Sequence, residues 1–174
     1  MALIDVERTY LQLLSLADLD RQGASQSDEV LVELRPCPVS VARTLYHDVG
    51  ARYHWRDRLA ISDDDLHAYL TREDVRVFVA RSAGRDDGFF ELVRHADGSV
   101  EIAYFGLMGH AQGRGLGRWM LVEACRAAFA WGASRVWLHT CTLDAPAALP
   151  NYRARGFVPY RVERYQVEMP DADA

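Results

Sequence analysis

Hydrophobic and polar positions recur with two different periods along the chain, and these periods predict a mixture of strands and helices. Apolar alternation or short apolar runs, which are typical of strands, occupy residues 29–35, 75–81, 88–94, 100–108, 135–142 and 157–168. Apolar residues at helical spacing occupy residues 39–49 and 62–71, the stretch from Gly117 to Gly132, and residues 144–155. The predicted order is β-α-α-β-β-β-α-β-α-β, in which the last segment forms a strand or a hairpin.

Capping and turn residues support these boundaries. Ser62 is a suitable N-cap, and Asp63 to Asp65 follow it where the helix dipole favours carboxylates, so we expect these acids to cap the helix rather than bind a metal. Asp97-Gly98 is a strong hairpin signal. The three strands between residues 75 and 108, joined by the segments AGRDDG and HADGS, are therefore expected to form an antiparallel meander.

The first 28 residues are expected to form an appendage to a single domain over residues 29–174. Residues 9–14 suit a strand, whereas residues 5–19 also suit an amphipathic helix. We favour a strand followed by a turn at residues 15–20. A polar linker, RQGASQSD, then leads to the apolar run from Val30.

The composition excludes several classes of protein. The chain has 174 residues, of which 49% are hydrophobic and 26% charged, which suits one domain with a sizeable core. Its formal charge of −5 disfavours nucleic acid or an anionic membrane as a partner. All 20 basic residues are arginine, so mechanisms that need a lysine, such as Walker-loop, kinase or Schiff-base chemistry, cannot operate here.

Cysteine and histidine usage predicts neither disulfides nor a metal site. The 3 cysteines are widely spaced and form no C-x-x-C motif, and the 6 histidines are too scattered for a ligand set. Asp5, Glu7 and Arg8 stand where a signal peptide needs apolar residues, and no apolar segment has the length of a membrane span. We therefore expect a cytoplasmic protein.

The segment Gln112-Gly113-Arg114-Gly115-Leu116-Gly117 follows a predicted strand and opens a predicted helix. Glycines allow consecutive backbone N–H groups to point at one anion, and the helix N-terminus adds partial positive charge, so this turn suits a pyrophosphate. A turn that only links strand to helix is the alternative. A dinucleotide fold fits poorly, because Arg118 stands where the last glycine of G-x-G-x-x-G belongs.

Gln112, Gly115 and Gly117 match [RQ]-x-x-G-x-[GA], the signature between the fourth strand and third helix of the GCN5-related N-acetyltransferase (GNAT) family. Residues 152–157, YRARGF, match the family's Y-x-x-x-G-F. The chain resembles this family over residues 29–168. The resemblance implies an α/β fold of the α+β kind: a mixed, mostly antiparallel sheet flanked by helices, with a V-shaped split between the strands at residues 100–108 and 135–142.

The resemblance also implies that acetyl-coenzyme A enters this split and that its pantetheine arm pairs with the fourth strand as an added strand does. Backbone groups of Phe105 and Leu107 would bond to pantetheine and the thioester, and the glycine turn would hold pyrophosphate. Arginines near the turn would reach phosphates. The implied cofactor-binding residues are Phe105, Leu107, Met108, Gln112, Gly113, Arg114, Gly115, Leu116, Gly117, Arg118 and Asn151.

Two residues are candidates for proton transfer. Glu101 precedes Gln112 by eleven residues, the offset of the catalytic glutamate in histone-type members, which implies a general base. A solvent-exposed glutamate at a strand edge is the alternative. Tyr152 occupies the motif position that often carries the general acid, and a core tyrosine is its alternative.

The sequence departs from the family pattern in two respects that bear on this site. Ala145 stands where many members carry an asparagine after the fifth strand, which leaves Asp144, expected to cap the next helix, or Asn151 as substitutes. Pro150 is also unexpected late in a helix, where it kinks the chain.

The acceptor pocket is implied at the segment between the two early helices and on the fifth strand. Its candidate residues are Tyr53, His54, Trp55 and His139, which as aromatic or buried residues also suit docking onto the core.

The sequence therefore predicts an N-acetyltransferase that uses acetyl-coenzyme A and no metal, with a small-molecule or peptide amine as acceptor and direct attack in a ternary complex. A catalytically silent acyl-coenzyme A binding or sensor module is one alternative, and a module for another nucleotide such as ATP or NAD is a second. Nucleic acid and membrane partners are not expected, and formation of a homodimer stays open.

Overall fold

The computed structural model describes residues 2–22, 24, 28–51, 53 and 55–169, which form a seven-stranded sheet in the order β2-β3-β4-β5-β6-β1-β7. The strands are β1 (Ala2–Leu13), β2 (Val30–Leu34), β3 (Val75–Ser82), β4 (Arg85–Arg94), β5 (Val100–Leu107), β6 (Val136–Cys141) and β7 (Val158–Met169). The helices are α1 (Val39–Gly50), α2 (Asp63–Leu70), α3 (Leu116–Ala130) and α4 (Ala148–Ala154), with short 3-10 turns η1 (Leu16–Asp18) and η2 (Gly109–Ala111). Among the strand pairs of these described residues only β5–β6 is parallel, so the predicted mixed, mostly antiparallel fold is confirmed.

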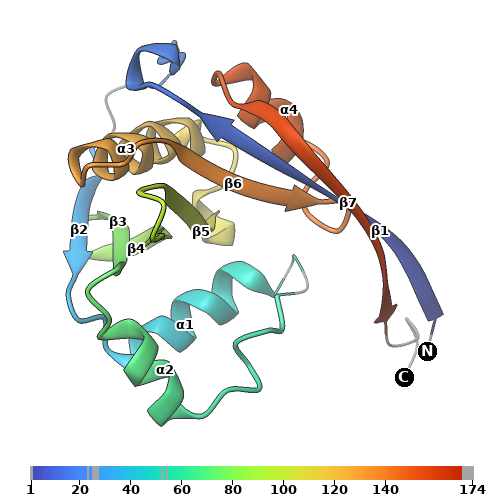
Figure 1. The fold of residues 1–174 in the computed structure, drawn as a ribbon. Coiled ribbons are helices and arrows are strands. Elements are labelled where there is room, and N and C mark those ends of the chain that lie inside the picture. The colour runs from blue at the N-terminus through green and yellow to red at the C-terminus, as the bar shows by residue number, and fades with distance from the viewer. Residues whose placement is uncertain (1, 23, 25–27, 52, 54, 170–174) are drawn as a thin grey trace.

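Helices cover both faces of the sheet (Figure 1). On the α3 face, Phe90 and Met120 are buried in a core to which β1 adds Leu11. On the α1–α2 face, Phe89 packs with residues such as Leu45. Successive residues of β4 thus enter opposite cores, which explains its unbroken apolar run. No helix among the described residues is long and apolar enough to span a membrane.

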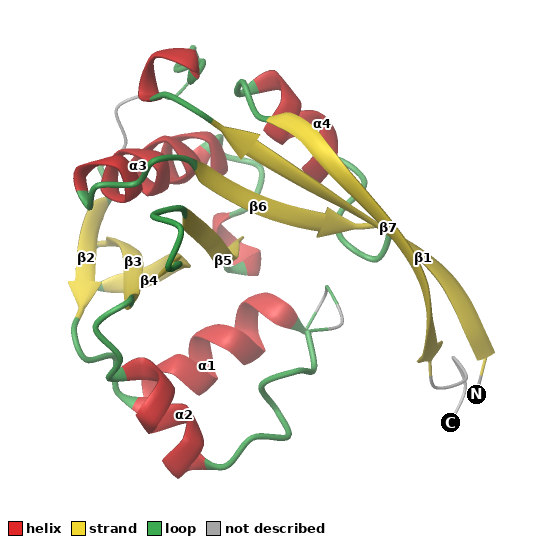
Figure 2. Cartoon of the chain, viewed as in Figure 1, coloured by secondary structure: helices red, strands yellow, loops and turns green. Residues whose placement is uncertain are grey.

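The N-terminal segment forms a strand, as favoured over a helix, and this strand lies inside the sheet. Residues 8–13 of β1 pair with β6, and residues 2–12 pair with β7 on the other side, both antiparallel. Residues 2–7 therefore extend with β7 past the end of β6 as a two-stranded ribbon (Figure 2).

Two predicted boundaries were wrong. The connection AGRDDG was expected to be a loop, but only Ala83 and Gly84 turn, both at positive φ (48° and 76°), and β4 begins at Arg85. Such a two-residue turn with both φ values positive matches the twist of a hairpin. The two aspartates thereby enter the strand, where Asp86 bonds to Arg81.

The fourth helix begins at Ala148 and not at Asp144, so Asp144 does not cap it. The Asp144 carboxylate instead accepts hydrogen bonds from the Thr140 hydroxyl at 2.7 Å and the Cys141 N–H at 2.8 Å. Because of this late start, Pro150 lies in the first turn of α4, where a missing N–H removes no helical hydrogen bond.

The parallel strands β5 and β6 separate almost as soon as they meet. Their pairing is limited to Val100 with Val136 and Glu101 with Trp137. On the other side of β5, Tyr104 pairs with Glu91 and Ile102 with Leu92, so Ala103 is the extra residue of a bulge. The expected split between these strands is therefore present, and it opens just beyond Glu101.

Gly156 allows the end of α4 to pack against the turn that follows β1. It has φ +103°, and a Cβ placed there would lie 2.1 Å from the Asp18 carbonyl oxygen. Gly132 is a matched control, because its φ is also positive (+91°) but a Cβ there meets nothing within 4 Å. We expect Gly132→Ala to cost about 1 kcal/mol and Gly156→Ala about 1–3 kcal/mol more, measured by urea unfolding. Equal losses would contradict the close contact.

Candidate active site

A cavity of about 1540 Å³ opens where β5 and β6 separate. Its walls come from β5, the start of α3, β6, the α4 region and the connection between α1 and α2. The sequence-predicted residues that line it are Glu101, Phe105, Leu107, Gln112, Gly115, Gly117, Arg118, Asn151, Tyr152, Tyr53, Trp55 and His139. Met108, Gly113, Arg114 and Leu116 are not among its lining residues, and His54 lies outside the described residues.

The side of the cavity where the sequence predicts the coenzyme is built mainly from backbone. Beyond Glu101, the edge of β5 that faces β6 has no strand partner in the described part of the chain, so it can pair with an extended ligand. At the end of this edge Gly115 is the N-cap of α3, at φ 76° and without a side-chain cap. A Cβ at Gly113 or Gly115 would meet nothing within 4 Å, so the backbone of this turn faces open space. These features suit an anion.

The predicted cofactor residues outside the lining fall into two groups. Met108 and Leu116 are 7% and 5% exposed, so their side chains belong to the core rather than to the ligand side. The Arg114 side chain is 54% exposed and lies 3.7 Å from a Glu29 oxygen. That contact attaches the glycine turn to the segment just before β2.

Glu29, the partner of Arg114, is itself buried and lies near a second buried carboxylate, Asp87. Asp87 is fully buried and accepts hydrogen bonds from Ser82 and from His110, the latter at 2.5 Å. Burial and the nearby Asp87 charge raise the pKa of Glu29. Within the described residues, no group of three or more His, Cys, Asp and Glu side chains is arranged to hold a metal ion.

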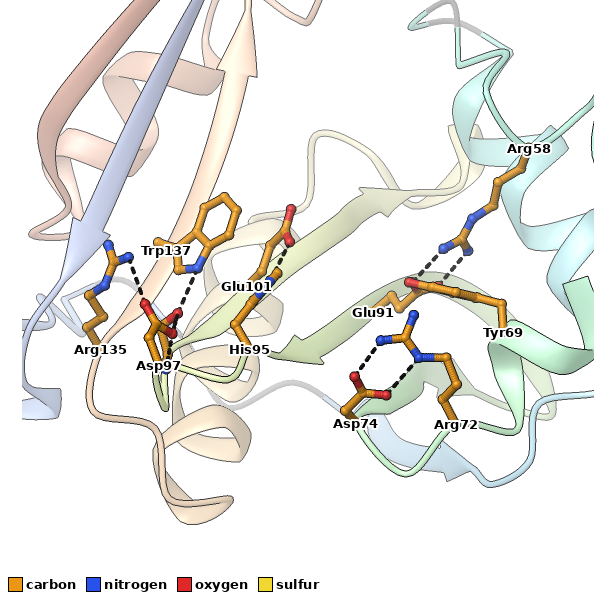
Figure 3. Close-up of polar contacts among 11 residues, drawn as sticks. Arg58, Tyr69, Arg72, Asp74, Glu91, His95, Asp97, Glu101, Arg135 and Trp137 are labelled. Atoms are coloured by element: carbon orange, nitrogen blue, oxygen red, sulfur yellow. Dashed lines mark hydrogen bonds and ion pairs between the residues drawn. The ribbon is translucent and has the colours of Figure 1, made fainter.

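Glu101 lies at the closed end of the split and is paired with a histidine that the sequence analysis did not select. Its Oε2 atom lies 2.8 Å from His95 Nε2, and the His95 ring centre is 5.3 Å from that of Trp137 (Figure 3). Burial raises the pKa of Glu101, while the His95 hydrogen bond opposes that rise. The Glu101 side chain is 16% exposed and that of His95 40%, so the histidine connects a buried carboxylate with solvent.

Tyr152 lines the same cavity from α4, and its ring centre lies 6.1 Å from that of Phe157. Burial, and secondly the Asp144 carboxylate, raise the pKa of Tyr152, so it is a protonated phenol at neutral pH. Its hydroxyl bonds to no other described residue. A proton donor without a competing acceptor therefore faces the cavity.

An ion pair anchors the connection between α1 and α2 to the sheet. Two Arg58 nitrogens lie 2.5 and 2.6 Å from the two Glu91 oxygens, and the Tyr69 hydroxyl donates to the same carboxylate (Figure 3). The side chains of Arg58 and Glu91 are only 12% and 1% exposed. The Arg58 guanidinium also lies 4.1 Å from the ring centre of Tyr104. This geometry fixes the wall opposite β6.

Aromatic residues complete that wall. Trp55 packs edge-on against Tyr104 and Phe89, with ring centres 5.1 and 6.2 Å apart. The hydroxyls of Tyr46 and Tyr104 both donate to Asp57. Trp55 thus docks onto the core and also lines the cavity, and its contact with an acceptor stays a prediction.

Tyr53 and His139 lie on different walls of the cavity. The Tyr53 hydroxyl accepts from Gln112 Nε2 at 3.4 Å, which connects the α1–α2 segment with the glycine turn. Burial, and secondly the charge of Arg8, lower the pKa of His139, so this imidazole is neutral at pH 7.

Sequence reasoning missed His95, Arg58 and Glu91. A signal for Glu91 was present, because a carboxylate inside the apolar run FFELV needs a buried partner. No local pattern identified Arg58 as that partner. His95 belongs to the segment HADGS, which the sequence analysis interpreted only as the connection of a hairpin.

The split mixed sheet, the glycine turn and the cavity at the split agree with the fold that the sequence predicts. A model of the acetyltransferase (GNAT) family matches residues 31–157. The chain therefore belongs to the GNAT acetyltransferase family, whose members generally use acetyl-coenzyme A. No curated protein matches the sequence.

Solved structures show the same fold. A GCN5-related N-acetyltransferase from Kribbella flavida is 20% identical with a TM-score of 0.61, over 90% of this chain and 56% of that one. Another from Sphaerobacter thermophilus is 15% identical with a TM-score of 0.63, over 93% and 51%. An aminoglycoside acetyltransferase from an uncultured soil metagenomic sample is 16% identical with a TM-score of 0.61, over 73% and 86%. The chain thus spans little more than half the length of the first two.

The buried ion pair gives a prediction about stability. Glu91→Gln leaves Arg58 buried without its counter-charge, so we expect a loss of about 3–5 kcal/mol in the free energy of unfolding. The exposed pair of Arg72 with Asp74, whose side chains are 49% and 38% exposed, is the control, and Asp74→Asn should cost at most about 1 kcal/mol. Urea unfolding measures both. Similar small losses would show that the α1–α2 connection does not depend on Glu91.

Proposed function

We propose that the protein transfers an acetyl group from acetyl-coenzyme A to a primary amine by direct attack in a ternary complex. The observation that carries the proposal is the cavity at the split, which is lined by the free edge of β5, the start of α3, Glu101 and Tyr152. Membership of the GNAT family supports the same reaction.

The residues present fit coenzyme A. The edge of β5 from Ile102 to Leu107 offers amide and carbonyl groups to the pantetheine arm. The backbone of Gly113 to Gly117 would hold the pyrophosphate, because the space that a Cβ would fill at Gly113 and Gly115 is open. Arg118, in the first turn of α3, lines the cavity and would pair with a phosphate.

In the proposed reaction the amine nitrogen bonds to the thioester carbon and the carbon–sulfur bond breaks. Glu101 accepts the proton that the nitrogen loses, and His95 passes it to solvent. Tyr152 gives its proton to the departing thiolate and recovers one from water. Holding the two reactants in attack geometry supplies an effective molarity of order 10⁵ M or more, so the protein mainly positions its substrates.

A silent module that binds acyl-coenzyme A is the alternative proposal, and Ala145 in place of the usual asparagine favours it. The two proposals differ in turnover. Thiol release from acetyl-coenzyme A in the presence of a panel of amines supports the enzyme, whereas tight binding without thiol release supports the module.

Gly115 provides a test of coenzyme binding. In Gly115→Ala the new Cβ enters the open space at the N-terminus of α3 and strains a residue at φ +76°, so we expect the Kd for coenzyme A to rise at least about 10-fold. Gly84→Ala carries the same strain, because Gly84 has the same φ, but lies in the β3–β4 turn and should leave the Kd unchanged. Calorimetry measures both. No heat from wild-type protein, or equal Kd values for both variants, would refute the coenzyme site.

Glu101 and His95 provide a test of proton transfer. We expect Glu101→Gln to lower kcat roughly 10²- to 10⁴-fold, with Glu33→Gln as a control away from the cavity. A base acts only when ionised, and burial raises the pKa of Glu101, so kcat/KM of the wild type should fall with decreasing pH earlier than for an exposed glutamate.

Removal of His95 should shift the pH profile of kcat/KM. His95 lowers the pKa of Glu101, so in His95→Ala the acid limb of kcat/KM moves to higher pH, and added imidazole restores part of the lost rate. A pH profile identical to that of the wild type would exclude His95 from the proton path.

A further inference from the structure

Arg8 lies on the face of the sheet that carries Glu101. Glu101 pairs with Trp137 on β6, and Arg8 pairs with Cys141, four residues further along the same strand. Because alternate residues of a strand share a face, both side chains point to the same side of the sheet. Arg8 also lines the cavity described above.

The Arg8 guanidinium is positioned by a tyrosine rather than by a carboxylate of opposite charge. Glu163, directly opposite on β7, is its natural partner, yet that carboxylate bonds to the Tyr10 hydroxyl at 2.8 Å and to Arg161. Arg8 Nη2 instead donates to the Tyr165 hydroxyl at 2.9 Å, with its guanidinium carbon 4.9 Å from the centre of that ring. In the described part of the chain, no carboxylate forms an ion pair with Arg8.

One donor of this side chain is unsatisfied. Arg8 Nε is buried and has no hydrogen-bond partner among the described residues. A buried donor without a partner is unfavourable, and a ligand that draws Nε into a hydrogen bond removes this penalty. A carboxylate suits this position, because it accepts two parallel hydrogen bonds from the fork of a guanidinium.

Unlike Arg8 Nε, three acidic side chains that line the cavity have hydrogen-bond or ion-pair partners. Asp57 binds two tyrosine hydroxyls, Asp74 pairs with Arg72, and Asp144 binds Thr140 and the Cys141 N–H. The charge of Arg8 acts inside the cavity, where after burial it lowers the pKa of His139, while Asp144 and Asp57 raise it.

We propose that Arg8 binds a carboxylate of the acceptor, so that the acceptor is an amine that also carries a carboxylate, such as an amino acid or a short peptide with a free C-terminus. This inference rests on the proposed function. Four residues along the strand direction, roughly 13 Å at 3.3 Å per residue, and two strand spacings of about 4.8 Å separate Arg8 from Glu101. Their Cα atoms are therefore roughly 16 Å apart, and both side chains shorten this gap. A molecule of one or two residues spans it.

Calorimetry on the protein saturated with coenzyme A tests this without turnover. The probes are amino acids and dipeptides, each compared with its C-terminal amide. We expect at least one acid to bind wild-type protein roughly 10- to 100-fold more tightly than its amide. In Arg8→Gln this ratio falls to about 1, and in Arg8→Lys, which keeps the charge but not the fork, it takes an intermediate value. Arg164→Gln, at an 82% exposed side chain paired with Glu7, keeps the wild-type ratio.

The inference is overturned if amides bind wild-type protein as tightly as acids, if polyamines or aminoglycosides bind more tightly than every acid, or if no acid gives heat. Because the wild-type comparison needs no variant, it stands even where Arg8→Gln fails to fold. Preferential binding of an acid with no thiol release from acetyl-coenzyme A would refute the proposed function and support the carboxylate site.

Discussion

The early separation of β5 from β6 is the constraint on which the cavity and its chemistry depend. The two strands share only two residue pairs, and the bulge at Ala103 follows at once on β5. β6 stays paired on its other side, because β1 follows it as far as Cys141. The sheet therefore remains continuous while one edge of β5 stays open. Such an edge invites aggregation when it is exposed, but here it lines a cavity inside the fold.

The wall opposite β6 depends on side chains, because the connection between α1 and α2 has little regular structure. Arg43 donates to the carbonyl oxygens of Arg58 and Ile61 at 3.2 and 2.8 Å, and Arg58 reaches Glu91 in the sheet. A buried ion pair adds little net stability, since desolvation offsets the attraction, but it penalises any arrangement in which one partner is left alone. The main effect of these contacts is therefore to fix the positions of Asp57 and Trp55. Their net contribution to the stability of the fold is small.

Local signals were sufficient for most elements and for the glycine turn at the start of α3. The cap at Ser62, the Asp97-Gly98 hairpin and the glycine turn each act within a few residues, so the sequence displays them directly. The place of β1 was not predictable in this way, because its partners lie more than 120 residues away and alternation says nothing about strand order. The same holds for Arg58, whose partner Glu91 is 33 residues distant.

The two sides of the cavity are made from different groups, and this difference explains why one is visible in the sequence and the other is not. The proposed coenzyme side uses backbone amides, which need glycine at particular positions, and a conformational requirement of that kind leaves a motif. The proposed acceptor side uses single side chains from β1, β5, β6, β7 and the α1–α2 connection. Each can change without disturbing the backbone, so the same scaffold can accept different amines, and no short pattern records which. The acceptor therefore has to be inferred from charges that the fold leaves unpaired, as it does at Arg8.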